Sequence, residues 1–168
     1  SVAVIAQVAD TTWDIIATGD FNYDGQSDIV WRNASTGIIV TWLMDGTSIG
    51  DYAGIAQVTD TSWNVVASAD FDANGSTDLV WRHASSGQIL IWLTDGISII
   101  DYEEIGTFAD ATWEIVGSGD YNDDSNADLL WRNQIDGKIV VWFLDGSDLI
   151  SQDSIGQVSD LSWKIVNQ

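Results

Sequence analysis

The sequence predicts an all-β protein, a β-propeller-like array of three four-stranded blades with incomplete terminal segments that another chain completes. Two observations predict this fold. The 168 residues repeat with a period of 50, and each repeat reads as four short strands separated by turn residues. Periods of 20 to 50 residues are typical of proteins in which similar units stack on one another.

The repeat has no slippage in its register. Trp13, Trp63, Trp113 and Trp163 align, and an Asp-Gly pair closes the third quarter of each unit at residues 45–46, 95–96 and 145–146. We predict a single repeat domain over residues 1–168. Its units cover approximately 13–62, 63–112 and 113–162, and a partial repeat at 154–168 matches residues 4–18.

Within the first unit, the expected strands are 13–21, 28–33, 38–44 and 52–58. The third of these is apolar on both faces, and its counterpart Ile89–Leu93 repeats the pattern. A lone sheet with one wet face would alternate polar and apolar residues, whereas a strand covered on both sides would not. This strand therefore favours sheets that pack face to face.

Composition excludes several classes of function. A formal net charge of -21, with only five Lys and Arg, excludes nucleic acid as a direct partner, because binding it depends on basic residues that displace counterions. The chain has no Cys, which excludes disulfides and thiolate zinc sites. Its 45% hydrophobic content predicts a folded chain. No apolar run approaches the roughly 18 residues of a membrane span, so no membrane insertion is expected.

Oxygen-bearing side chains recur in the nine-residue loop between the first two strands of every unit. They stand at loop positions 1, 3, 5 and 9, and the backbone carbonyl of position 7 adds a further oxygen. A hard cation such as Ca²⁺ requires six to eight oxygen ligands. We therefore predict about three Ca²⁺ ions, one per unit, held by Asp20, Asn22, Asp24, Gln26 and Asp28; by Asp70, Asp72, Asn74, Ser76 and Asp78; and by Asp120, Asn122, Asp124, Asn126 and Asp128.

The opening of the loop matches the D-x-[DN]-x-[DN]-G of an EF-hand, but position 12 is Trp31 rather than Glu and the flanks read as strands. No helix pair is expected. The alternative is that Asp, Asn and Gly merely form turns. Three copies with the same oxygen spacing favour the metal. The third loop is the weakest, because Ser125 replaces the Gly that relaxes the turn.

These loops, the following Trp-Arg strand and the G-x-I-x-x-W-x-x-D-G hairpin together resemble the FG-GAP or VCBS repeats of bacterial secreted proteins, which are related to the integrin-α propeller. The resemblance covers nearly the whole chain. It implies Ca²⁺ bound for structural purposes, a secreted or cell-surface location, and adhesion or carbohydrate binding. Such propellers generally have six or seven blades, whereas this chain has three.

Three further residue types have two interpretations each. Arg32, Arg82 and Arg132 are expected to bridge carboxylates such as those of their own loops, or else to clamp a sugar or carboxylate. His83, the single His, is expected to be a surface substitution. Most Trp residues are expected in the core between blades, with an exposed, ligand-facing set at Trp13, Trp63 and Trp113 as the alternative.

The terminal blades would each leave an apolar face open, so we expect another copy of the chain to bury it, in a closed ring or a filament. The function predicted is that of a non-enzymatic, secreted, calcium-stabilised protein that acts by self-assembly and adhesion at the cell surface. The first alternative is a multivalent lectin that binds a glycan. A glycan-active enzyme is a third class. It is disfavoured because no unit carries an acidic pair that the others lack, apart from Glu103 and Glu104.

Overall fold

The computed structural model describes residues 7–165. Within that range the chain forms twelve β-strands and no helix, in agreement with the predicted all-β class. The strands are β1 Trp13–Gly19, β2 Asp28–Asn33, β3 Ile38–Asp45, β4 Ser48–Gln57, β5 Trp63–Ala69, β6 Asp78–His83, β7 Gln88–Asp95, β8 Ser98–Thr107, β9 Trp113–Gly119, β10 Asp128–Asn133, β11 Lys138–Asp145 and β12 Asp148–Gln157.

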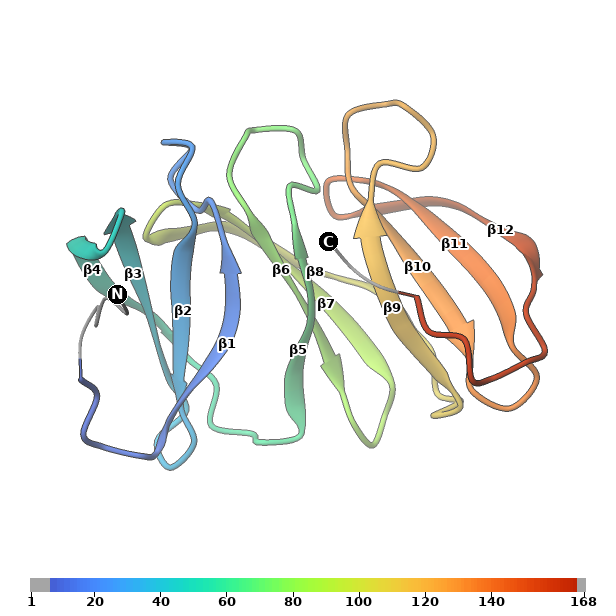
Figure 1. The fold of residues 1–168 in the computed structure, drawn as a ribbon, viewed down its shortest axis with the longest axis horizontal. Helices are drawn as coiled ribbons and strands as arrows, with labels where there is room; N and C mark the ends of the chain where they lie inside the picture. The colour runs from blue at the N-terminus through green and yellow to red at the C-terminus, as the bar shows by residue number, and fades with distance from the viewer. Residues whose placement is uncertain (1–6, 166–168) are drawn as a thin grey trace.

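Each unit makes one four-stranded antiparallel sheet whose strands follow one another in sequence order (Figure 1). Two strand boundaries of the first unit differ from the prediction by more than one residue. The first strand ends at Gly19, because the loop begins to turn at Asp20, and the fourth begins at Ser48 rather than Tyr52. The hairpin explains the second difference, since its turn is only Gly46 and Thr47, so that Asp45 and Ser48 already pair.

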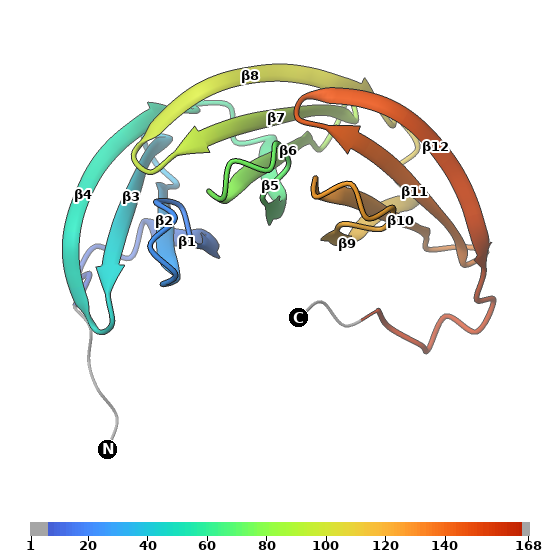
Figure 2. The same cartoon turned by 90° about the horizontal axis from the view of Figure 1, so that it is seen from above.

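The three sheets stand side by side along an arc (Figure 2). Strands β1, β5 and β9 lie on its concave side, and the long strands β4, β8 and β12 follow its convex side. Each of the sheets that the described residues form is open, with one strand at either edge.

Apolar side chains fill the seam between neighbouring sheets. One cluster joins the first and middle units and includes Phe21, Ile39 and Trp81, which are each at most 1% exposed. The second cluster joins the middle and third units and includes Phe71 and Trp131, both fully buried. Both faces of β7 are therefore covered, as its doubly apolar sequence predicts. Burial of such large side chains is the main source of stability in a sheet stack.

The arginines are not paired with loop carboxylates, and that prediction is wrong. Arg32 donates hydrogen bonds to the backbone carbonyls of Val58 at 2.8 Å, Asp60 at 2.9 Å and Trp63 at 2.5 Å. These carbonyls belong to the segment that connects β4 to β5. Arg82 and Arg132 hold the equivalent segments at 108–113 and 158–163. Backbone carbonyls carry no sequence signal, which is why the pairing was not predictable.

His83 is not a surface substitution, and this prediction is also wrong. Its side chain is only 15% exposed, its Nε2 lies 3.2 Å from Asp60 Oδ2, and its ring meets Trp63 edge to face. Its Nδ1 accepts the backbone N–H of Ser86. The ring therefore does what Asn33 does in the first unit, where the amide oxygen accepts a backbone N–H and the amide nitrogen donates to the preceding segment.

Candidate metal centre

The three oxygen-rich loops, 20–28, 70–78 and 120–128, all lie at the same end of the array, at the top of Figure 1. Each one connects the innermost strand of a sheet to the second strand. The concave strand thus leads directly into the loop, and the loop ends on a buried aspartate that opens the second strand.

The middle loop brings the most carboxylates together. Asp70, Asp72 and Asp78 each offer an oxygen, and these oxygens lie within 4.8 Å of one another. Asp70 also organises the backbone, because its two oxygens accept the N–H groups of Asn74 at 3.1 Å and Gly75 at 2.9 Å. The loop is therefore folded around its own acidic groups, with the first carboxylate at its centre.

The ninth loop position is the most deeply buried carboxylate of each unit. Asp78 is fully buried and accepts two backbone N–H groups, from Phe71 at the start of the loop and from Thr94 in β7, each at 2.8 Å. Asp28 and Asp128 are equally buried and make the same two bonds in their own units. This aspartate therefore fixes the loop to the sheet.

Burial is the largest cause of the raised pKa of these buried carboxyl groups. Loss of solvent raises the pKa of Asp78 to about 7, against the lowering effect of its two backbone hydrogen bonds, and the nearby charges of Asp72 and Asp70 raise it further. Burial likewise raises the pKa of Asp28, Asp72 and Asp128. A cation placed among these carboxylates would favour their ionised forms.

The loop backbone is left-handed at two positions. The fourth position has φ of 58° at Tyr23, and the sixth has φ of 84° at Gly25. The other loops match, and the third loop places Ser125 at φ 80° where its sisters have Gly. The sixth position explains the Gly, because a side chain there is strained. The third loop keeps the same shape at the cost of that strain.

The other two loops differ at the third position. Asn22 and Asn122 replace an Asp, and their amide groups donate to Asp24 at 3.0 Å and Asp124 at 2.8 Å. At the seventh position, the Gln26 side chain turns away to accept the N–H of Gly46 at 2.7 Å. Ser76 is buried, and the backbone N–H of Asn126 donates to Asp124. Among the described residues, carboxylates cluster closely only in the middle loop.

The loop carboxylates have no cationic side chain beside them in residues 7–165. The two ion pairs found there join His83 to Asp60 and Lys138 to Asp136, both remote from the loops in sequence. Mutual repulsion among the loop aspartates is therefore uncompensated by the protein. The donor set consists of carboxylate, amide and backbone oxygens, which are the ligands that Ca²⁺ prefers. Asp70, Asp72, Asn74 and Asp78 are the residues that fit such an ion best.

The loops also form part of the seams, which sequence reasoning missed. The carbonyl of Asp20 accepts the N–H of Thr77 in the next loop at 2.7 Å, and the carbonyl of Phe21 accepts the N–H of Gly96 at 2.6 Å. The same two bonds join Asp70 to Ala127 and Phe71 to Gly146. The backbone at the start of the first two loops is thus hydrogen-bonded directly to the unit that follows. An available signal was the Phe or Tyr at loop position 2.

The inner tryptophans Trp13, Trp63 and Trp113 are half-buried. Trp13 lines a cavity of about 250 Å³ on the face of the first sheet that is turned away from the middle sheet, together with Trp31, Trp42 and Tyr52. Trp113 instead packs against Phe108 with 5.3 Å between ring centroids. The equivalent aromatic positions therefore do not form three identical clefts.

Comparison with known proteins returned no relationship: the chain matches no protein-family model and no curated protein. Over the described range, the strands are accompanied by no helix of the length and apolar character that a bilayer crossing requires.

Proposed function

We propose that this chain is a non-enzymatic, calcium-stabilised β-repeat protein, a propeller-like array of blades that acts outside the cell by self-assembly and adhesion. The observation that carries the proposal is the loop of the middle unit, where three carboxylates converge without a cationic partner. Bringing like charges together costs free energy, and a bound divalent cation reverses the sign of that contribution.

The role proposed for the metal is structural. Asp20 and Asp70 are candidate ligands through their side chains, and their backbone carbonyls accept hydrogen bonds from the next unit. An ion held by one of these loops would therefore stabilise the seam as well as the loop itself. Three ions would reduce the formal charge of -21 by six. Lower charge favours contact between copies of the chain, because two strongly acidic surfaces repel each other.

Support for adhesion comes from the convex side of the arc. The outer strands carry exposed side chains of a kind usually found at contact surfaces, with Tyr52 68%, Tyr102 69% and Ile150 63% exposed. Secretion and a cell-surface location rest on the resemblance to FG-GAP and VCBS repeats. The multivalent lectin is the second candidate, and the observation in its favour is the aromatic lining of the cavity beside Trp42.

The test is a comparison of the protein in excess Ca²⁺, in Mg²⁺ and in EDTA. Differential scanning calorimetry should give a melting temperature that is higher in Ca²⁺ than in Mg²⁺ or EDTA, and light scattering should give a larger particle in Ca²⁺. Equal melting temperatures in all three would rule out the structural metal. A glycan array on the Ca²⁺-loaded protein tests the lectin, which requires binding of one sugar class that is lost on substitution of Trp42.

A further inference from the structure

We propose that the two end faces of the array bind each other in a second copy of the chain, through the same contacts that form the internal seams. This deepens the self-assembly part of the proposed function by naming its partner and its surfaces. The carboxyl-end face is defined as Tyr121, Ile155, Val158 and Trp163. The amino-end face is defined as Trp31, Val40, Trp42 and Ile49, whose counterparts in the middle unit lie in the first seam.

The carboxyl-end face is made of residues that are buried elsewhere in the repeat. Tyr121 is 46% exposed, whereas its counterparts Phe21 and Phe71 are at most 1% exposed. Ile155 is 58% exposed, whereas its counterpart Ile105 is 6% exposed and belongs to the cluster of the second seam. These differences have one cause, which is that the units of Phe21, Phe71 and Ile105 are followed by another sheet.

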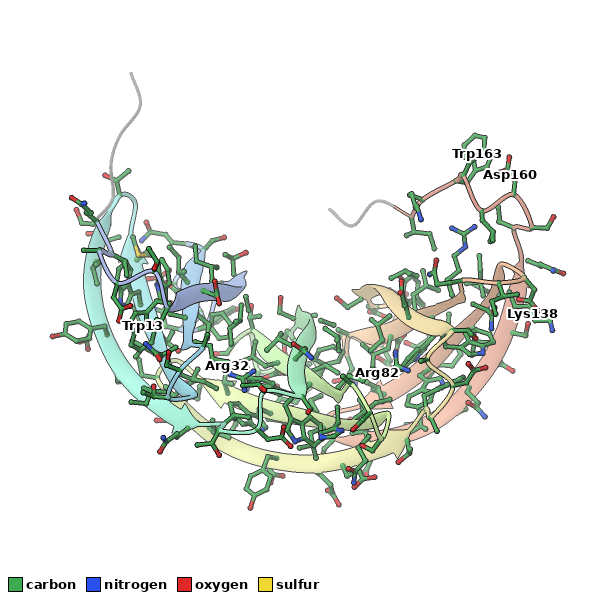
Figure 3. All side chains as sticks on the ribbon, turned by 90° about the horizontal axis from the view of Figure 1, so that it is seen from below. Trp13, Arg32, Arg82, Lys138, Asp160 and Trp163 are labelled. Atoms are coloured by element: carbon green, nitrogen blue, oxygen red, sulfur yellow. The ribbon has the colours of Figure 1, made fainter. Side chains whose placement is uncertain are left out.

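The segment that follows β12 completes this face. Val158 is 39% exposed and Trp163 is 69% exposed. Figure 3 shows Trp163 and Asp160 at one end of the arc, on a segment that stands apart from the sheets. In the interior seams the equivalent segments run between two sheets, so that Phe108, the counterpart of Val158, stacks on Trp131 with 5.0 Å between ring centroids.

The amino-end face is the surface that such a segment covers in the other units. Trp31 and Trp42 correspond to Trp131 and Trp142, which pack against Phe108 in the second seam. In the first unit their rings instead line the cavity of about 250 Å³. The amino-end face therefore has the same aromatic lining as the surface that the third unit contributes to the second seam.

One backbone N–H beside the amino-end face is bonded to a side chain, whereas its counterparts are bonded to the preceding unit. Gly96 and Gly146 each donate their N–H to a carbonyl of the preceding unit. Gly46, the equivalent residue of the first unit, donates to the side chain of Gln26 at 2.7 Å. In the junction, the carbonyl of Tyr121 from a second copy takes the place of that side-chain oxygen.

The arginines of the first two units each lie over a tryptophan ring of the unit that follows. Arg32 lies 5.7 Å from the centroid of Trp81, and Arg82 lies 5.4 Å from that of Trp131, each across a seam. Within residues 7–165 no aromatic ring lies against Arg132 in this way. A second copy would bring its Trp31 to that position, where the guanidinium and ring attract each other.

Two equivalent segments of the repeat could cover the amino-end face. One is residues 8–13 of the same copy, and the other is residues 158–163 of the second copy. Arg132 holds the second segment through the carbonyls of Val158, Asp160 and Trp163. The first segment has no arginine on it among the described residues. We therefore expect Val8 and its neighbours to leave and Val158 to enter.

The occupant is a second copy rather than a different protein, because each face is covered inside this chain by its own complementary surface. The arc places the first and third sheets across from each other (Figure 2). Two copies joined at both ends would therefore enclose a common axis, and we expect a dimer of twice 18.3 kDa.

The experiment measures particle mass by size exclusion with light scattering, at several protein concentrations in excess Ca²⁺. Four variants each add one negative charge. Val158→Asp and Val40→Asp place it on the carboxyl-end and amino-end faces. Val8→Asp places it on the displaced segment, and Ile100→Asp places it at a 54% exposed position of the middle unit, as the control.

The wild-type chain, Val8→Asp and Ile100→Asp should be dimers, whereas Val158→Asp and Val40→Asp should each be monomers. An equimolar mixture of the two monomeric variants should regain a dimer, because one intact face of each kind is then present. Should Val40→Asp fail to fold by circular dichroism, Ile49→Asp replaces it, because Ile49 is exposed and its counterpart Ile99 packs against the cluster of the first seam.

A wild-type chain that stays monomeric, dimerisation that survives both face variants, or a mixture that stays monomeric would each overturn the proposal. Calcium titration of Val158→Asp distinguishes a failure of the proposed dimer from a failure of the proposed calcium binding. If the variant binds Ca²⁺ as the wild-type chain does, a change in mass reports on the faces alone.

Discussion

Asp78 and Thr94 are joined inside the middle sheet by a 2.8 Å hydrogen bond, in which the backbone N–H of Thr94 donates to a fully buried carboxylate oxygen. The other oxygen of Asp78 holds the start of the loop through Phe71. One acidic side chain thus connects the loop, the second strand and the third strand. The same group is the candidate ligand with the most strongly raised pKa.

The first prediction concerns pH in the absence of divalent cations. Burial raises the pKa of Asp78 from its ordinary 3.8 to about 7 in the folded chain, so the folded state binds the proton more tightly than the unfolded state does. The resulting stability is fully present below pH 3.8 and is lost as pH rises through about 7. In EDTA, the melting temperature should therefore be higher at pH 5.5 than at pH 8.

Asp78→Asn is the control for this effect, because it keeps one oxygen acceptor and does not titrate. The difference in melting temperature between pH 5.5 and pH 8 should shrink by roughly 3 °C or more in this variant. If the variant and the wild-type chain give the same difference, Asp78 is not the responsible group. Excess Ca²⁺ should reverse the trend in the wild-type chain, since the ion binds only the ionised carboxylate.

The second prediction concerns the charge of the middle loop. The double substitution Asp70→Asn with Asp72→Asn removes two charges, and it leaves Asp70 with one acceptor oxygen for the two backbone N–H groups that it holds. The rise in melting temperature on adding Ca²⁺ should fall by about a third. Stability in EDTA should change little, because the relief of repulsion offsets the lost hydrogen bond. Asp51→Asn with Asp101→Asn removes the same charge from exposed strand positions. That control should leave the calcium response intact.

The third prediction concerns the left-handed residue in the third loop. Ser125 has φ of 80°, so Ser125→Gly should stabilise the chain by about 1 kcal/mol, measured by urea unfolding. Gly25→Ser is the converse change, at φ 84° and with open space around a new Cβ. It should destabilise the chain by a similar amount. Changes of the same sign in both variants would show that backbone conformation is not the cause.

The fourth prediction concerns the arginines. Arg82→Lys loses the fork that bonds three carbonyls and the contact with Trp131, and should cost about 2–4 kcal/mol. Arg132→Lys should cost less in dilute, monomeric protein, where no ring lies against Arg132 within the described residues. Equal costs would argue that the ring contact contributes nothing.

Sequence periodicity was sufficient to predict the sheets. In the first unit the turn residues locate β1, β2 and β3 to within two residues of their bounds, and the doubly apolar third strand correctly indicates face-to-face packing. The start of β4 was misplaced because Ser48, Gly50 and Asp51 have low strand propensity and residues 48–51 lie on an exposed edge, where no burial pattern marks a strand.

The contacts between units were beyond prediction for a physical reason. Arg32 recognises backbone carbonyls, and the Asp20 carbonyl recognises a backbone N–H, so neither contact depends on a complementary side chain. His83 shows a related limit. A ring that accepts at Nδ1 and donates at Nε2 reproduces an amide, a substitution that spacing alone does not indicate.

The most direct test of the account is a calorimetric titration of Ca²⁺ into chain that has been stripped with EDTA and dialysed into metal-free buffer. The account predicts saturable binding of about three ions per chain, with the melting temperature rising in step. A titration with no heat of binding, accompanied by the same melting temperature in Ca²⁺ and in EDTA, would contradict it.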